Sequence, residues 1–434
     1  MSDIHLPLEA SVSSEGKPPQ PPESGDVDQH DKGKVASFGA LKIRNFRRFW
    51  IGMLFFYNAM QMGMVARGWL VFTLTDSAMA LGLVSAGWGL PMVMFSLFGG
   101  VITDRFRKRN LMLISQAGLF LISLAIAILI ETELISLWHL VTASICSGFV
   151  LALGLPARQA FVKDLVGESD ILNAVSLNSM AMNLCRIVSP ALAGILIKYI
   201  GIPGVYWLIV VSYIFNIVMI SIIPAGERIK TKKEISISDD LMEGLRYLRQ
   251  NPLIRILLLL AFVPIVMAMP YQMLMPVFAK TVFGAGETGL GILMSAVGVG
   301  ALIGSLTLSL LRGLQYKGIF MLLAGLLFGA FLVLFSQSGS LYLACFFLLF
   351  AGIGNSVFFT LTNTLIMENT PEKLTGRVMS VYMMTWGLMP LGILPAGYLA
   401  ETFGAPATVT GGGLVVLLIV LIVFIFQPRI RGVR

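Results

Sequence analysis

The feature that most constrains this chain is a series of long apolar runs that begins near residue 49 and ends near residue 427. An α-helix rises about 1.5 Å per residue, so about 20 apolar residues cross the hydrocarbon core of a bilayer. Runs of this length occupy residues 49–74, 81–102, 111–130, 137–157, 171–199, 204–224, 253–282, 288–311, 318–336, 341–366, 376–402 and 407–427. The sequence therefore predicts an all-α integral membrane protein with twelve transmembrane helices.

The content and placement of charged residues support this class. Only 12% of the residues are charged, whereas a soluble domain carries about 25%. The net charge of +8 could indicate nucleic-acid binding, but the basic residues lie in short segments between the apolar runs. That distribution is typical of the cytoplasmic loops that orient a membrane protein. We therefore expect a lipid bilayer around the chain and no nucleic-acid partner.

The same basic residues predict the orientation. With the N-terminus assigned to the cytoplasm, alternating spans place all of them on the cytoplasmic side except Arg67, Arg186, Lys198 and Lys280. Arg158 falls in the loop after the fourth run, which itself contains no arginine. An odd number of spans would break the alternation. We expect a multi-pass protein of the cell membrane, the inner membrane in a Gram-negative source, with both termini cytoplasmic.

The runs fall into two sets of six, separated by a polar stretch. An offset of 204 residues takes Gly100 to Gly304 and Gln159 to Asn363. Internal similarity of this kind is typical of transporters in which one half moves against the other. The predicted organisation is a disordered cytoplasmic tail (1–40), a six-helix bundle (41–224), a cytoplasmic linker with a short helix (225–252), a second six-helix bundle (253–427) and a basic cytoplasmic tail (428–434).

The chain offers little for catalysis or metal binding. Its three cysteines lie inside apolar runs without metal-ligand spacing, and its three histidines are scattered. The sequence shows no nucleotide-binding loop and no nucleophile triad. We therefore expect no catalytic residue, no metal and no cofactor, which argues against a primary pump or a hydrolase.

A charged segment follows the second run: Gly99-Gly100-Val101-Ile102-Thr103-Asp104-Arg105-Phe106-Arg107-Lys108-Arg109. It resembles the loop signature of the major facilitator superfamily, G-x-x-x-D-R-x-G-R-[RK], with Arg107 in place of the second glycine. The resemblance implies a cytoplasmic gate formed by Gly100, Asp104, Arg105, Lys108 and Arg109 against the start of the eleventh span near Arg377. Gly100 would let two helices approach, and Asp104 would accept hydrogen bonds from a helix N-terminus. The alternative is a plain basic loop that only orients the protein.

Six further stretches narrow the resemblance: Trp69–Val71, Ala80–Leu83, Pro156–Val162, Leu172–Ala174, Asn183–Gly194 and Gly376–Ser380. They look like the secretion-effector and drug-exporter branch of that superfamily, which includes exporters of enterobactin. The resemblance spans about residues 40 to 427. It implies the major facilitator fold, export of small molecules and coupling to protons.

Proton coupling rests on the resemblance alone, because no acidic residue lies centrally in a predicted span. The acids of the apolar region lie near the outer ends of spans: Asp76, Glu131, Glu133, Glu287 and Glu401.

Arg186 is the main candidate for substrate binding, because ionisable groups inside a membrane are costly and usually functional. Ser179, Asn183 and Arg186 are spaced i, i+4, i+7 and share a helical face. We expect Arg186 to face a water-filled cavity and bind an anionic or carbonyl group. The alternative is a structural arginine bonded to backbone carbonyls. Arg67, by contrast, is expected near the outer end of its span, where its side chain would snorkel to the membrane surface.

Other side chains complete the predicted cavity. Asn58 and Gln61 are candidate donors and acceptors, with helix–helix bonding as the alternative. The remaining candidates are Trp88, Tyr271, Gln272, Asn355 and Trp386. Pro190, Pro264, Pro270 and Pro276 are expected to bend their helices, because proline lacks a backbone donor. The 24 methionines suit adaptable binding of bulky amphipathic molecules, although most are expected only to pack.

Together these features predict a monomeric secondary active transporter that exports small amphipathic molecules, such as a drug, a siderophore or a related metabolite, by alternating access. The alternatives are an importer or a lysophospholipid-type flippase on the same fold, and a non-transporting membrane sensor. The duplication and the segment around Asp104 argue against the sensor.

Overall fold

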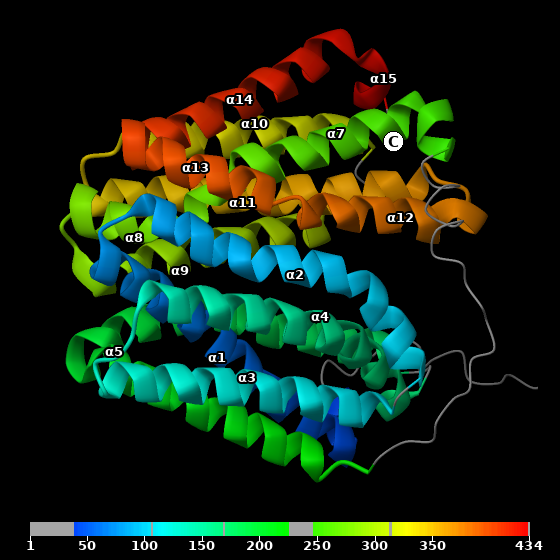
Figure 1. Ribbon diagram of the computed structural model, residues 1–434. Coiled ribbons are helices and arrows are strands. Elements are labelled where there is room, and N and C mark those ends of the chain that lie inside the picture. Colours follow the sequence, from blue (N-terminus) through cyan, green and yellow to red (C-terminus); the bar gives the residue numbers. More distant parts are fainter. Residues whose placement is uncertain (1–38, 106, 168–169, 225–245, 312–314, 433–434) are drawn as a thin grey trace, which may run out of the picture.

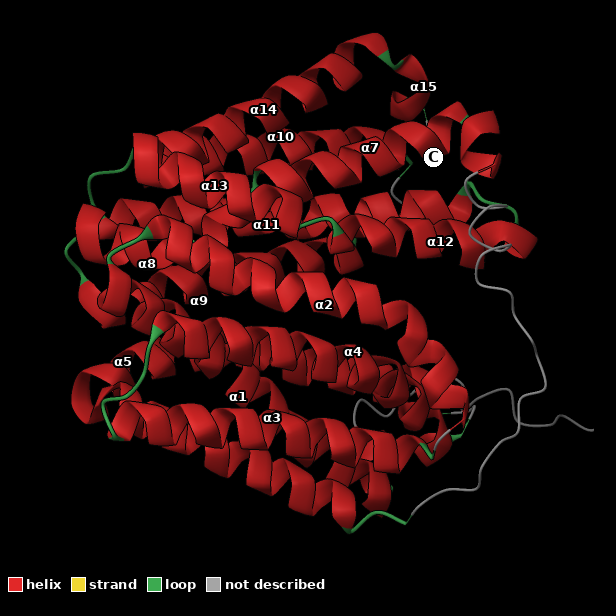
Figure 2. Ribbon diagram, viewed as in Figure 1, coloured by secondary structure: helices red, strands yellow, loops and turns green. Residues whose placement is uncertain are grey.

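The computed structural model describes residues 39–105, 107–167, 170–224, 246–311 and 315–432. Every regular element in these ranges is a helix (Figure 2). Most of the predicted N-terminal tail and most of the predicted linker lie outside the described residues. The end of the predicted short helix, residues 246–250, is described and is helical. The detailed limits of the predicted domains therefore stay predictions.

The N-terminal half starts with a short 3-10 turn, η2 (Gly39–Lys42), and contains five long helices. They are α1 (Arg44–Thr75), α2 (Ala78–Arg105), α3 (Lys108–Glu131), α4 (Leu137–Val166) and α5 (Ile171–Ser221). Helix α5 consists of two helices joined at Gly201, whose φ of 71° and ψ of 173° are not helical. Glycine adopts a positive φ without steric cost, so the chain turns back at Gly201 and crosses the half a sixth time.

The C-terminal half begins with a broken helix. It consists of α7 (Pro252–Met267), the 3-10 turn η3 (Met269–Gln272), α8 (Met275–Val277) and the π-helical turn η4 (Phe278–Val282). The remaining helices are α9 (Gly286–Leu310), α10 (Lys317–Ser336), α11 (Leu341–Glu368), α12 (Glu372–Gly387), α13 (Pro390–Phe403), α14 (Ala405–Phe426) and α15 (Pro428–Arg431).

These helices are compatible with twelve membrane crossings. Ten helical segments of the described chain are long and apolar enough to cross a bilayer, and α5 is one of them although it crosses twice. Helix α2 contributes a shorter apolar part, Ala78–Met92.

The prolines act differently along the chain. Pro264 lies inside α7, and Pro270 and Pro276 lie in the short turns that follow. Each lacks an N–H for the helical ladder, and three prolines in close succession coincide with the broken path. Pro190 lies inside α5, where Gly201 is the residue with non-helical dihedral angles. The missing N–H of Pro190 instead leaves the carbonyl of Arg186, four residues earlier, without its helical partner.

The helices form two bundles that lie side by side (Figure 1). Helices α1 to α5 pack on one another, and α7 to α14 do the same. The halves touch mainly where α5 meets α9 and where α2 meets α13. Helix α1 begins and α15 ends at one end of the molecule, here called the termini end. The turn between α1 and α2 lies at the other end, here called the latch end.

The α5–α9 contact is a close crossing of two backbones. A Cβ atom added to Gly194 of α5 would lie 2.5 Å from the carbonyl oxygen of Glu287, and one added to Gly291 of α9 would lie 2.5 Å from that of Pro190. Ser295 Oγ of α9 also donates a hydrogen bond to the Ile187 carbonyl at 2.6 Å. Lipid tails are as apolar as the helices, so close approach of small residues is what holds helices together inside a membrane.

We predict that Gly194→Ala lowers the thermal unfolding temperature of the detergent-solubilised protein. The added methyl group must push two backbones apart, and overpacking of this kind costs about 1–3 kcal/mol. Gly411→Ala in α14 is the matched control, because a Cβ there meets no atom within 4 Å. Equal unfolding temperatures for the two variants would contradict a tight crossing.

Candidate functional site

A cavity of about 1190 Å³ lies between the two halves. Its walls come from α1 to α5 on one side and from η3, α8, α9, α11, α12 and α13 on the other. The cavity is somewhat larger than the 300–1,000 Å³ typical of small-molecule sites. Its methionines are Met60, Met64, Met92, Met269, Met273, Met294, Met379, Met383, Met384 and Met389. Their flexible thioether side chains give a soft apolar surface that adapts to ligands of different shapes.

The charge of the cavity is positive. Arg67 and Arg186 are the charged residues of the described lining, which contains no Asp, Glu, Lys or His. Charges act more strongly in a low-dielectric cavity than in water, and walls of one sign concentrate ligands of the other. The site therefore favours molecules that carry negative charge.

Arg186 lies halfway along the first part of α5, about 22 Å from the start of the helix at 1.5 Å per residue. Its side chain is partly buried and borders the cavity. Tyr271 of η3 lies within electrostatic range of its guanidinium group. The Arg186 carbonyl faces α9, where a Cβ at Gly298 would lie 2.9 Å from its oxygen. Arg186 thus belongs both to the cavity and to the crossing that joins the halves.

Arg67 does not snorkel to the surface as the sequence suggested. It lies eight residues before the end of α1, about 12 Å into the bundle, and its side chain borders the cavity. Arg67 Nη1 donates a hydrogen bond to Ser144 Oγ of α4 at 3.3 Å, and Tyr206 and Tyr213 of α5 lie within electrostatic range.

The width of the α1 face that borders the cavity explains why the sequence predicts the wrong position for Arg67. Its lining residues are Ala59, Met60, Gln61, Gly63, Met64, Arg67, Gly68 and Val71. At 3.6 residues per turn these cover more than a third of the helix circumference. Because so much of α1 borders the cavity, both Gln61 and Arg67 reach it. A narrow lining face would include only one of these two residues.

Six predicted cavity residues border the cavity together: Gln61, Trp88, Arg186, Gln272, Asn355 and Trp386. The side-chain amides of Gln272 and Asn355 meet at Met269 Sδ, each at 3.8 Å. The ring of Trp386 lies 4.9 Å from that of Phe359, centroid to centroid. These contacts place amide groups and an aromatic pair on the wall of the C-terminal half.

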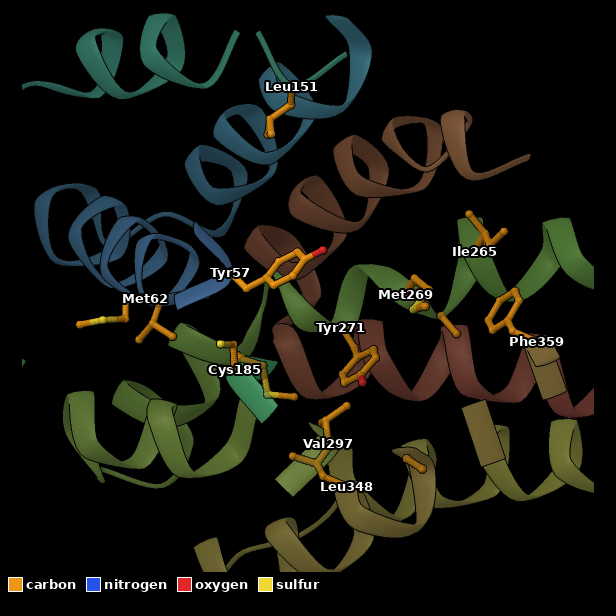
Figure 3. Packing of buried hydrophobic residues seen from close by; sticks show 14 of the residues in the cluster. Tyr57, Met62, Leu151, Cys185, Ile265, Met269, Tyr271, Val297, Leu348 and Phe359 are labelled. Carbon is orange, nitrogen blue, oxygen red and sulfur yellow. The ribbon is translucent and has the colours of Figure 1, made fainter. Parts of the chain in front are cut away.

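Four residues that the sequence predicts in the cavity are not among the described residues that line it: Asn58, Ser179, Asn183 and Tyr271. Asn58 lies on the neighbouring face of α1, whereas Ser179 and Asn183 precede Arg186 on α5. Helical spacing fixes the face of a helix but not the depth at which that face borders a cavity. Tyr271 is buried and points toward Val297 of α9 and Leu348 of α11 (Figure 3).

Arg158 is a further functional candidate, although the sequence predicts it in a cytoplasmic loop. Helix α4 continues to Val166, so Arg158 lies inside it and is only 6% exposed. Its guanidinium carbon lies 3.9 Å from the centre of the Phe56 ring. Its Nε and Nη2 atoms find no hydrogen-bond partner among the described residues. The basic charge of Arg158 was visible in the sequence, but the continuation of the helix past Pro156 was not.

The predicted gate is described only in part. Gly100, Asp104 and Arg105 belong to the last turns of α2, and the surroundings of these three residues lie outside the described part of the structure. Lys108 forms an ion pair with Asp164 of α4 at 2.8 Å, and Arg109 donates hydrogen bonds to the carbonyls of Ile220 and Ser221. Lys108 and Arg109 therefore stabilise their own half. Helix α12, which carries Arg377, contacts α2, and the gate between them stays a prediction.

Polar contacts tie the halves together at the latch end. Glu401 of α13 accepts hydrogen bonds from the backbone N–H groups of Ala78 at 2.7 Å and Met79 at 3.1 Å and from Ser77 Oγ at 3.1 Å. It thereby caps the N-terminus of α2 from the other half, where a negative charge is favoured. Lys280 of η4 pairs with Asp76 at the end of α1. We call these two contacts the latch.

Comparison with known proteins gives the family. The chain matches the model of the family described as transmembrane secretion effector over residues 35–431. The staphyloferrin A transporter of Staphylococcus aureus (strain NCTC 8325 / PS 47) is 24% identical over 348 residues, which cover 79% of this chain and 86% of the relative. The enterobactin exporter EntS of Escherichia coli O1:K1 / APEC is 26% identical over 349 residues, which cover 79% of this chain and 82% of the relative.

Solved structures of transporters share the fold. The nucleoside transporter NupG has a TM-score of 0.68 at 13% identity, with 88% of this chain and 100% of that chain covered. A D-xylose-proton symporter has a TM-score of 0.66 at 15% identity, with 90% and 99% covered. At these identities the likeness shows the fold alone. The family match over nearly the whole chain, the helical fold and the central cavity lead to one conclusion: the chain is a multi-pass membrane transporter that belongs to the transmembrane secretion effector family of the major facilitator superfamily.

Proposed function

We propose that the protein exports small amphipathic anions from the cytoplasm by alternating access. The observation that carries the proposal is the cavity between the halves, whose described charges are two arginines and whose remaining surface is rich in methionine. The relatives named for staphyloferrin A and enterobactin support a siderophore or a related metabolite as the substrate, and the enterobactin exporter supports the outward direction.

The orientation follows from the positive-inside rule, which assigns the termini end to the cytoplasm. The cavity extends toward that end along Gln159 of α4 and Gly376 and Ser380 of α12. The latch then closes the outer end, so this conformation accepts substrate from the cytoplasm. Release requires the Glu401 and Lys280 contacts to break while α2 and α12 close on the cytoplasmic side.

Coupling to the proton gradient is part of the proposal and has the family resemblance as its support. The described lining contains no carboxylate, so the proton would travel on the substrate or exchange at an acid outside the cavity, such as Glu401. The proposed working unit is a monomer.

Export can be tested in cells that lack their own copy of the transporter. Expression of the wild-type protein is expected to lower the cell content of enterobactin or staphyloferrin A, and Arg186→Gln is expected to weaken that export about tenfold or more. Loss of a hydrogen bond to a charged group costs about 1.5–3 kcal/mol. Export of a cationic dye such as ethidium should be spared, and Arg186→Lys should retain part of the anion export.

Surface-labelled protein serves as the control for folding and insertion in that experiment. A wild-type protein that raises the cell content of the anions would reverse the direction. Equal loss of anion and dye export in the Arg186→Gln variant would show that Arg186 has a structural role.

Weakening the latch is expected to open the cavity to the outside. With the native cysteines replaced by serine, Gln272→Cys provides a cavity thiol that a membrane-impermeant maleimide can report. Glu401→Ala should raise the rate of labelling from outside severalfold, and Lys280→Ala should raise it less, because exposed ion pairs contribute about 0–1 kcal/mol.

Lys317→Ala is the matched control for the latch variants, because it breaks an ion pair with Glu368 inside one half. Labelling rates that respond equally to all three substitutions, or to none, would show that the latch does not hold the outer end closed.

A further inference from the structure

The surroundings of Arg67 differ from those of Arg186. Arg67 borders the cavity from α1, and its hydrogen-bond partner Ser144 belongs to α4 and is fully buried. Tyr206 and Tyr213 of α5 also border the cavity and lie near the same guanidinium group. Ser144 itself does not line the cavity, so its buried hydroxyl holds the Arg67 guanidinium group from behind, while the two tyrosines line the cavity on the same half.

The positive charge of Arg67 has no counter-charge among the described residues. Its partner there is the neutral hydroxyl of Ser144, and the described lining offers no carboxylate. A guanidinium group inside a membrane protein carries a desolvation cost, and no anion in the described part of the chain offsets that cost for the half-buried Arg67 side chain. An anionic ligand would relieve this cost, and the hydroxyl groups of the cavity-lining Tyr206 and Tyr213 can donate further hydrogen bonds to its oxygens.

We propose that Arg67, Tyr206 and Tyr213 form a second anion subsite in which Ser144 positions the Arg67 guanidinium group, and that the transported molecule is an amphipathic dianion. One anionic group binds Arg186 and the other binds Arg67, while the apolar middle of the molecule lies on the methionine-rich wall. The inference rests on the proposed function and names its substrate class.

The two subsites have different relations to the moving halves. The Arg67 subsite consists of residues from α1, α4 and α5, all in the N-terminal half. Arg186 lies at the α5–α9 crossing, near Tyr271 of the C-terminal half. The anionic group at Arg67 therefore stays with one half throughout the cycle, whereas the surroundings of the group at Arg186 change when the halves move.

A series of linear diacids from six to twelve carbons, each with its own monomethyl ester, separates the two charges experimentally. Affinities are measured by calorimetry on the purified protein in nanodiscs. For at least one chain length the wild-type protein should bind the diacid about tenfold more tightly than its monoester. Arg67→Gln should reduce this ratio to about one and leave the monoester affinity within twofold.

Arg255→Gln in α7 is the matched control, because it removes a positive charge from an exposed position and should keep the ratio. Ser144→Ala and Tyr213→Phe keep the guanidinium group and should each lower the ratio severalfold, so the test also holds if Arg67→Gln fails to fold. The proposal is overturned by a wild-type ratio near one at every length, or by a ratio that none of these cavity variants lowers. It is also overturned if Arg67→Gln weakens diacid and monoester alike.

This binding assay needs no ion gradient and does not report the direction of transport. A protein that shows the charge-dependent ratio but fails to export would contradict the proposed function and leave the second subsite standing. A protein that exports anions but shows no such ratio would contradict the second subsite alone.

Discussion

The crossing of α5 and α9 is the contact on which the cavity depends. Lipid supplies no hydrophobic force between helices, so the two halves are held by close backbone packing at Gly194 and Gly291. Pro190 leaves the Arg186 carbonyl without its helical donor, and Ser295 of α9 bonds the next carbonyl, that of Ile187. The same short segment of α5 therefore supplies the joint between the halves and a positive charge in the cavity.

The internal repeat explains how the halves meet at the latch end. Asp76 and Lys280 are 204 residues apart, which is also the offset between Gly100 and Gly304. Equivalent positions of the two halves thus lie together and carry opposite charges. Their ion pair is exposed and contributes little energy, which suits a contact that must open in every cycle. Glu401 adds charge-assisted hydrogen bonds to the N-terminus of α2 at the same end.

Much of the fold could be predicted from the sequence, because a helix must satisfy its own backbone hydrogen bonds in lipid and apolar length then marks each span. Arg186, Gln272 and Asn355 stand out in the sequence because polar groups are rare in such spans, and all three border the cavity. The sequence does not predict the position of Arg67, because spacing alone does not give the width of a cavity. The sequence predicts a loop around Arg158, because proline usually marks a helix boundary. Pro156 does not end α4, so Arg158 lies inside the helix. The latch could not be predicted, since it joins residues of different halves.

The central claim is that one cavity reaches both sides of the membrane as the halves rock about the α5–α9 crossing. Spin-label distances test it most directly, with one pair at Asn110 and Tyr316 on the termini end and another at Glu133 and Gln337 on the latch end, all exposed positions. The account predicts that conditions that shorten one distance lengthen the other. Distances that stay fixed, or that change together in the same direction, would contradict it.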